Sequence, residues 1–162
     1  MIRPALPSDT PRLLALTADT AVFKPHEIKV LEELLGEYHA GSLGEDHTAI
    51  VLHQGPEGNS ESIVGYAYYA PDVMTDRTWY LYWIAIERQR QGSGLGSQLL
   101  RYVEADICRR RGRLLFIETS SLPHSEATRR FYHKHGYEVN GQLRDFYSDG
   151  DDMVIFRKRL SK

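Results

Sequence analysis

Apolar positions recur with two different spacings along this chain of 162 residues, and the spacing separates strands from helices. Runs of apolar, aromatic and β-branched residues predict strands at residues 1–6, 47–53, 62–70, 79–86, 114–119, 137–146 and 153–159. Apolar residues three or four positions apart predict helices after Ser8, at 26–40, from the glycines at 92–96 to about Arg111, and at 126–135. The pattern therefore predicts about seven strands and about four helices.

The turns between these segments predict how the strands pair. The turn signal from Gly55 to Ser60 joins the second and third strands as an antiparallel hairpin, and the strand at 79–86 follows them. That strand is apolar at both parities, which predicts a central strand covered on both faces. The helix that follows it leads to the strand at 114–119 by a right-handed crossover, which makes those two strands parallel. We therefore expect a mixed α/β fold with a mostly antiparallel sheet, in one domain spanning residues 1–162.

Three glycines, Gly92, Gly94 and Gly96, stand where the central strand gives way to a helix. A helix start carries unpaired N–H groups and a partial positive charge, so it favours an anion such as a phosphate. The chain lacks the Lys-Ser/Thr pair of a nucleotide-hydrolysing P-loop. A dinucleotide fingerprint would place the third glycine at position 97, whereas this chain has Gly96 and Ser97, so that fingerprint fits imperfectly.

Two motifs resemble those of the Gcn5-related N-acetyltransferase (GNAT) family. Gln91–Gly96 fits the pattern Gln/Arg-x-x-Gly-x-Gly/Ala, and Phe131–Tyr137 fits the aromatic-Tyr ending of the helix after the parallel strand. The resemblance covers nearly the whole chain and implies the acyl-CoA N-acyltransferase fold, with helices on both faces of the sheet. It also implies acetyl transfer from acetyl coenzyme A to a primary amine of a small molecule or peptide, by direct attack through a tetrahedral intermediate.

The resemblance also implies where the coenzyme binds. The turn would hold its pyrophosphate, the backbone of the preceding strand would pair with its pantetheine arm, and Ser125 would touch that arm unless it serves only as a helix N-cap. The implied contacts are Ile84, Ala85, Ile86, Gln91, Gly92, Ser93, Gly94, Leu95, Gly96, Ser97, Ser125 and Tyr132.

Three side chains are candidates for proton transfer. In the family, a tyrosine at the position of Tyr132 commonly protonates the departing thiolate, and a phenol is protonated at neutral pH. An ammonium must lose a proton before it can attack, and the resemblance makes Glu118 the first candidate base, ahead of Glu87. The alternatives are a packed aromatic for Tyr132 and ordinary strand-end carboxylates for Glu118 and Glu87.

The amine acceptor is expected to be a cation, because aromatic faces and carboxylates attract positive charge. The alternative is that the aromatics fill the core and the acids solvate a hairpin. By resemblance, His26 and Glu27 are further acceptor contacts. The residues considered are Tyr66, Tyr68, Tyr69, Tyr80 and Tyr82 on the strands, and Asp145, Phe146, Tyr147, Asp149, Asp151 and Asp152 on the last hairpin.

Composition narrows the partners. The net charge of −2 and the estimated pI near 6.4 give no support to a nucleic acid or an anionic membrane as partner. The single cysteine, Cys108, allows no internal disulfide, and it is expected to pack in a helix in a cytoplasmic protein. His133 and His135 are two apart on a helix and point apart, so no metal site is expected. We expect a monomer or homodimer.

Two other functions compete with acetyl transfer. A nicotinamide-dinucleotide oxidoreductase would use Glu118 to bind a ribose, but it requires alternating strands and helices where the first half of this chain predicts antiparallel strands. A non-catalytic coenzyme A-binding module would share the glycine turn and lack turnover.

Overall fold

The structure is a computed structural model that describes residues 1–161, and its elements follow the predicted order. The strands are β1 (Ile2–Pro4), β2 (Thr48–His53), β3 (Ile63–Pro71), β4 (Thr78–Ile86), β5 (Leu114–Ser120), β6 (Glu138–Ser148) and β7 (Asp151–Arg159). The α-helices are α1 (Thr10–Asp19), α2 (Pro25–His39), α3 (Leu95–Arg109) and α4 (Glu126–Lys134). Short 3₁₀ turns lie at Pro7–Asp9, Ser60–Ser62, Arg88–Arg90 and Pro123–Ser125.

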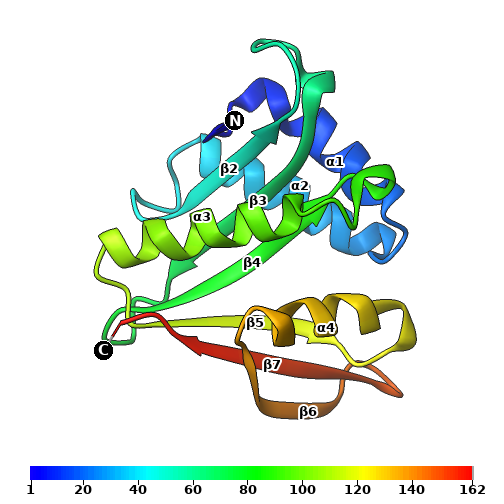
Figure 1. The fold of residues 1–162 in the computed structure, drawn as a ribbon, viewed down its shortest axis with the longest axis vertical. Helices are drawn as coiled ribbons and strands as arrows, with labels where there is room; N and C mark the ends of the chain where they lie inside the picture. Colours follow the sequence, from blue (N-terminus) through cyan, green and yellow to red (C-terminus); the bar gives the residue numbers. More distant parts are fainter. Residues whose placement is uncertain (162) are drawn as a thin grey trace. The chain divides into compact units, whose positions relative to one another are not determined.

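The seven strands are hydrogen-bonded in the order β1-β2-β3-β4-β5-β7-β6. Strands β4 and β5 are parallel, whereas β1–β2, β2–β3, β5–β7 and β6–β7 are antiparallel. The predicted mixed, mostly antiparallel α/β fold is therefore confirmed (Figure 1).

The contacts within the chain define two compact units. The first unit holds residues 1–70 and 83–103, and the second holds residues 71–82 and those from Glu104 onward. Strand β4 and helix α3 each contribute residues to both units. The single domain expected from the sequence stays a prediction.

The first unit has a core between β2–β3 and the helices α1 and α2. Alternate residues of β3 face this core, including Tyr66 and Tyr68, which lie against leucines such as Leu16 and Leu35. The other parity of β3 faces α3, where Gly65 lies beside Leu99. Strand β3 is thus covered on both faces, which explains why eight of its nine residues are buried.

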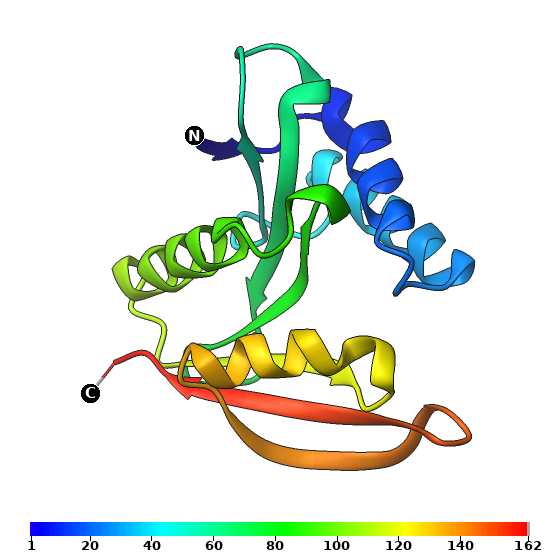
Figure 2. The same ribbon diagram turned by 45° about the vertical axis from the view of Figure 1, so that its right-hand side comes forward.

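The second unit contains β5, β7 and the edge strand β6, with α4 lying along β5 and β7 (Figures 1 and 2). Tyr132 of α4 packs on Phe156 of β7, with ring centroids 5.4 Å apart. The ammonium of Lys158 binds the Glu104 carboxylate at 3.0 Å and the His135 carbonyl at 2.8 Å. These contacts tie α3, through Glu104, and the C-terminal end of α4 to β7.

The end of α3 differs from the sequence prediction. The sequence predicts a helix to about Arg111, but α3 ends at Arg109 and Arg111 is left-handed, with φ 63°. Gly112 serves packing, because an added Cβ would lie 2.2 Å from Ile107 and 2.7 Å from the Trp79 ring. The guanidinium of Arg110 lies over that ring, 4.5 Å from its centroid. Glycine is therefore required here by crowding rather than by backbone conformation.

Alanine at two glycines of the first unit should have opposite effects on stability. At Gly36, inside α2, an added Cβ meets nothing within 4 Å, so alanine should stabilise by about 0.5–1 kcal/mol through higher helix propensity. At Gly65, an added Cβ would lie 2.6 Å from Ile86 Cδ1, so alanine should destabilise by roughly 1–3 kcal/mol. Urea unfolding of both variants measures the difference. Equal shifts in midpoint would contradict the close packing at Gly65.

Candidate active site

The glycine turn follows β4 directly and leads into α3. Gly92 and Gly94 have φ of 81° and 86°, a conformation that side chains disfavour, and Leu95 then begins the helix. An added Cβ at Gly92 or Gly94 would meet no atom within 4 Å, so space is open beside the backbone. Gly96 and Ser97 lie in the first helical turn, where the helix is electropositive. The turn thus offers an anion both space and favourable charge.

Side-chain hydrogen bonds fix this turn to the strand before it. The amide Nε2 of Gln91 donates to the Ile86 carbonyl at 3.2 Å, and the Ser93 hydroxyl donates to the Arg90 carbonyl. Gln91 therefore spans the connection from β4 to the glycines. This contact gives Gln91 a structural role in this chain.

The strand residues Ile84–Ile86 lie past the parallel pairing of β4. That pairing joins Thr78–Leu81 to Leu114–Ile117, whereas β4 continues to Ile86. The side chains of Ala85 and Ile86 are buried in the first unit. What these residues could offer a ligand is therefore backbone.

Tyr132 lies in a ring of aromatic side chains in the second unit. Its ring centroid is 5.6 Å from that of Phe131 and 5.9 Å from that of Tyr137. Burial raises the pKa of the Tyr132 hydroxyl above its ordinary value of 10.0, so the phenol keeps its proton at neutral pH. Such a group can donate a proton but does not act as a base.

Ser125 is buried and stands at the N-cap position of α4, but its side chain makes no capping hydrogen bond. Ser125 therefore occupies the N-cap position considered from the sequence, but its side chain does not cap the helix.

Glu118 lies with aromatic side chains and a second acid in the second unit. The ring centroid of Tyr80 is 5.6 Å from that of Tyr82 and 5.9 Å from that of Phe116. Burial, and then the negative charges of Glu118 and Asp72, raise the pKa of both tyrosines. Partial desolvation raises the pKa of Glu118 above 4.5 although the residue stays accessible to solvent. The cluster presents aromatic faces and negative charge together.

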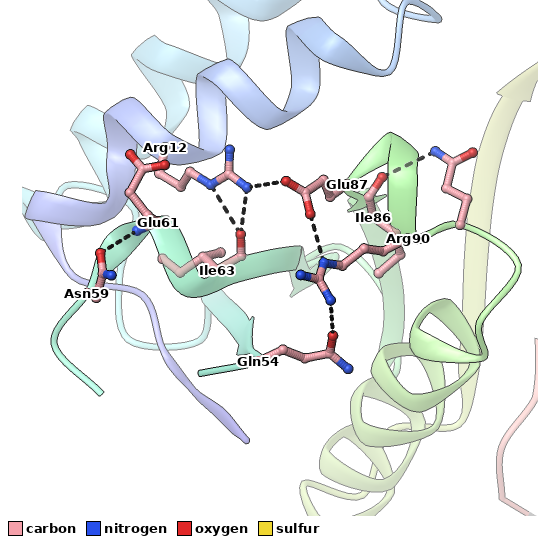
Figure 3. A network of polar contacts seen from close by, with 9 residues as sticks. Arg12, Gln54, Asn59, Glu61, Ile63, Ile86, Glu87 and Arg90 are labelled. Atoms are coloured by element: carbon pink, nitrogen blue, oxygen red, sulfur yellow. Dashed lines mark hydrogen bonds and ion pairs between the residues drawn. The ribbon is translucent and has the colours of Figure 1, made fainter. Parts of the chain in front are cut away.

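Glu87 has a different environment, in the first unit. Its Oε1 accepts from Arg12 Nη2 at 2.8 Å, and its Oε2 accepts from Arg90 Nε at 3.0 Å (Figure 3). These two arginines lower the pKa of Glu87. A carboxylate held between two cations is a weak base, so this environment favours a structural role.

Several predicted acceptor contacts prove to be core residues. Tyr66, Tyr68 and Tyr69 are at most 1% exposed. The Tyr66 hydroxyl bonds to Thr17, and that of Tyr68 lies 2.6 Å from His47 Nδ1. The acceptor role predicted for these three tyrosines is wrong, because β3 is covered on both faces.

Two acids of the last hairpin, Asp145 and Asp152, hold the hairpin together. Asp152 accepts from Gln142 Nε2 at 2.7 Å and from the Asp145 amide at 2.9 Å, while Asp145 accepts from the Gly150 amide at 2.8 Å. Asp151 is buried and bonds to Ser120. Asp149, Phe146 and Tyr147 remain exposed. At the start of α2, Glu27 accepts from the Lys24 amide, and His26 is exposed.

The sequence did not point to Arg12 or Phe116 as parts of these clusters. Arg12 is 75 positions from Glu87, so no local pattern links them. Among residues 1–161, no group of three or more His, Cys, Asp or Glu side chains is placed to hold a metal ion. Within the same range, none of the helices is long and apolar enough to span a membrane.

Comparison with known proteins supports the family. The model of the acetyltransferase (GNAT) domain matches residues 45–139. A solved structure of a GNAT-family protein from Desulfovibrio desulfuricans is 35% identical over 99% of each chain, with a TM-score of 0.89. No match was found among the curated proteins compared with the chain.

Two more distant structures share the fold. The ribosomal-protein-S18-alanine N-acetyltransferase of Escherichia coli is 19% identical, covering 100% of this chain and 94% of its own, with a TM-score of 0.77. An aminoglycoside 6'-N-acetyltransferase in complex with coenzyme A is 17% identical, covering 100% of this chain and 98% of its own, with a TM-score of 0.77. The family model and the 35% identical structure show the family: this chain belongs to the GNAT family of acetyltransferases.

Proposed function

We propose that this protein transfers the acetyl group of acetyl coenzyme A to a primary amine of a small molecule or peptide. Membership of the GNAT family carries the proposal. The family match and the antiparallel first half of the sheet speak against a dinucleotide oxidoreductase. A non-catalytic coenzyme A-binding module remains the alternative, and only turnover separates it from an enzyme.

The coenzyme's pyrophosphate is proposed to bind the turn from Gln91 to Ser97. The two left-handed glycines, the open space beside them and the helix start that follows all suit a phosphate group. A fold relative, the aminoglycoside 6'-N-acetyltransferase, binds coenzyme A. The backbone of Ile84–Ile86 and the side chains of Ser125 and Tyr132 are the proposed contacts of the pantetheine arm and thioester.

Two side chains are proposed to move protons. Glu118, directly or through water, takes a proton from the ammonium, and the freed amine nitrogen attacks the acetyl carbonyl carbon. As the tetrahedral intermediate collapses, the carbon–oxygen double bond re-forms, the carbon–sulfur bond breaks and Tyr132 gives its proton to the sulfur. The nitrogen loses its remaining extra proton to water, and a proton from water restores Tyr132. The raised pKa of each group supports this assignment, since Glu118 becomes a stronger base and Tyr132 stays protonated. Glu87 is less suited as the base, because Arg12 and Arg90 lower its pKa.

The acceptor is proposed to approach as a cation. Tyr80, Tyr82 and Phe116 supply aromatic faces, and Glu118 and Asp72 supply negative charge near the two tyrosines. Aromatic faces and carboxylates both attract ammonium groups. Two fold relatives are named for amine acceptors, an aminoglycoside and an alanine of a ribosomal protein.

Acetyl transfer can be measured with a panel of amines and acetyl coenzyme A. We expect turnover, with a small alkylammonium substrate preferred over a neutral arylamine and kcat/KM falling as salt rises. Gly94→Asp tests the turn as the binding site. It should fold but lose coenzyme binding in a calorimetric titration, because its carboxylate repels phosphates. Coenzyme binding without turnover of any amine would favour the non-catalytic module, and unchanged binding by Gly94→Asp would reject the turn as the site.

Removing the proton donor should slow the reaction. Tyr132→Phe keeps the ring and its packing, so turnover should fall roughly tenfold to a thousandfold with little change in coenzyme affinity. Steady-state kinetics and a calorimetric titration measure the two quantities. Turnover equal to that of the unmodified protein would assign Tyr132 to packing alone.

Removing the base should change the pH dependence. A base works when deprotonated, so kcat/KM should rise with pH through the pKa of Glu118, which burial places above 4.5. Glu118→Gln should remove this acidic limb and lower turnover roughly tenfold to a thousandfold. Glu138→Gln, which alters an exposed acid paired with Arg157, serves as the control and should keep the limb. An acidic limb that persists in Glu118→Gln would move the role to Glu87 or to water.

A further inference from the structure

The carboxylate of Glu87 is the centre of a polar network in the first unit (Figure 3). Besides binding Glu87, Arg12 of α1 donates from Nε and Nη2 to the Ile63 carbonyl at the start of β3, at 3.1 and 3.0 Å. Arg90 donates from Nη1 to Gln54 Oε1 at 2.7 Å. The network therefore joins α1, Gln54 just after β2, the start of β3, and the 3₁₀ turn that precedes the glycines.

Each end of this network is anchored on a rigid element. Arg12 lies on α1, and its guanidinium binds the β3 backbone. The Glu87 amide donates to the Val64 carbonyl of β3 at 2.8 Å, so both the backbone and the side chain of Glu87 are held. The side chains of Arg12 and Glu87 are 16% and 24% exposed, which shields their ion pair from solvent more than a surface pair.

Arg90 carries the anchoring into the glycine turn. Its amide donates to the Glu87 carbonyl at 2.8 Å, and its own carbonyl accepts from the Ser93 hydroxyl. One residue later, Gln91 binds Ile86 through its side chain. Without such contacts, a segment containing Gly92 and Gly94 would sample many conformations, and a ligand would have to order them on binding.

We propose that Arg12, Glu87 and Arg90 form a positioning network that holds the glycine turn in its anion-binding shape before the coenzyme arrives. Arg12 and Glu87 act through the turn backbone and touch no substrate. The consequence for acetyl coenzyme A rests on the proposed function, whereas the consequence for the shape of the ligand-free turn does not.

This role makes a different pH prediction from that of a general base. Because the pKa of Glu87 is lowered, its contacts are complete above 4.5 and are lost only as pH falls through the lowered pKa. Glu87→Gln should therefore weaken coenzyme binding to the same extent throughout the pH range around neutrality and leave the acidic limb of kcat/KM in place. Loss of that limb in Glu87→Gln would identify Glu87 as the base and overturn the positioning role.

The test uses Glu87→Gln, Arg12→Gln and the double variant, each compared with the unmodified protein. The first measurement is hydrogen exchange of the ligand-free proteins, in which amides of residues 88–97 should exchange faster in all three variants. The second is steady-state kinetics, in which the KM for acetyl coenzyme A should rise about threefold to thirtyfold with kcat nearly unchanged. The double variant should show no larger rise in exchange or KM than either single variant, because either substitution alone already breaks the network.

Arg3→Gln is the matched control. Arg3 forms a comparable ion pair in the same unit, with Nη1 and Nη2 at 2.7 and 3.0 Å from the carboxylate of Asp9, and its other side-chain contact is the Pro4 carbonyl. This variant should lose stability without changing exchange at 88–97 or the KM for acetyl coenzyme A. An equal change in Arg3→Gln would reduce the effect to general destabilisation and overturn the proposal.

The two measurements separate this proposal from the proposed function. Faster exchange at 88–97 in the Glu87 and Arg12 variants supports the network even if the unmodified protein transfers no acetyl group. Unchanged exchange in both variants overturns the network even if acetyl transfer is observed. Additive losses in the double variant would also overturn it, because they would mean that the two residues act separately.

Discussion

The close approach of α3 to β3 is the constraint on which the glycine turn depends. An added Cβ at Gly65 would lie 2.6 Å from Ile86 Cδ1, 3.1 Å from Leu99 Cδ1 and 3.1 Å from the Ala85 carbonyl. The missing side chain lets the end of β4 and the second turn of α3 pack directly on β3. Both ends of the glycine turn are therefore fixed to β3, because the end of β4 and the start of α3 both pack on that strand.

Polar contacts then define the path between those two fixed ends. Gln91 binds the last carbonyl of β4, Ser93 binds Arg90, and Glu87 holds Arg90 and Arg12. Two glycines supply the left-handed conformations that the path requires. Packing places the ends and hydrogen bonds shape the segment between them, which is how a flexible glycine sequence can present a defined backbone surface to an anion.

Patterns that act over a few residues could be read from the sequence. The glycines at 92 and 94, the apolar spacing of α3 and the turn at Gly55 predicted the strand–turn–helix unit and the antiparallel hairpin correctly. Residues whose type suits two different roles were harder to interpret. Past the end of α3, Arg111 takes the left-handed conformation, and Gly112 makes room for Trp79 instead. Tyr66 and Tyr68 suggested a ligand surface, but their burial depends on helices that are distant in sequence.

The two candidate bases illustrate why the site could be predicted only in part. Glu87 and Glu118 are the same residue type, one directly after β4 and the other near the end of β5, and in the sequence only the family resemblance ranked Glu118 ahead of Glu87. Their surroundings shift their pKa values in opposite directions, because Glu87 lies between two arginines while Glu118 lies among aromatic rings. The decisive cation, Arg12, is on the first helix. A carboxylate's task in this fold is thus set by which distant elements surround it, and the same chemistry can either hold a loop or accept a proton.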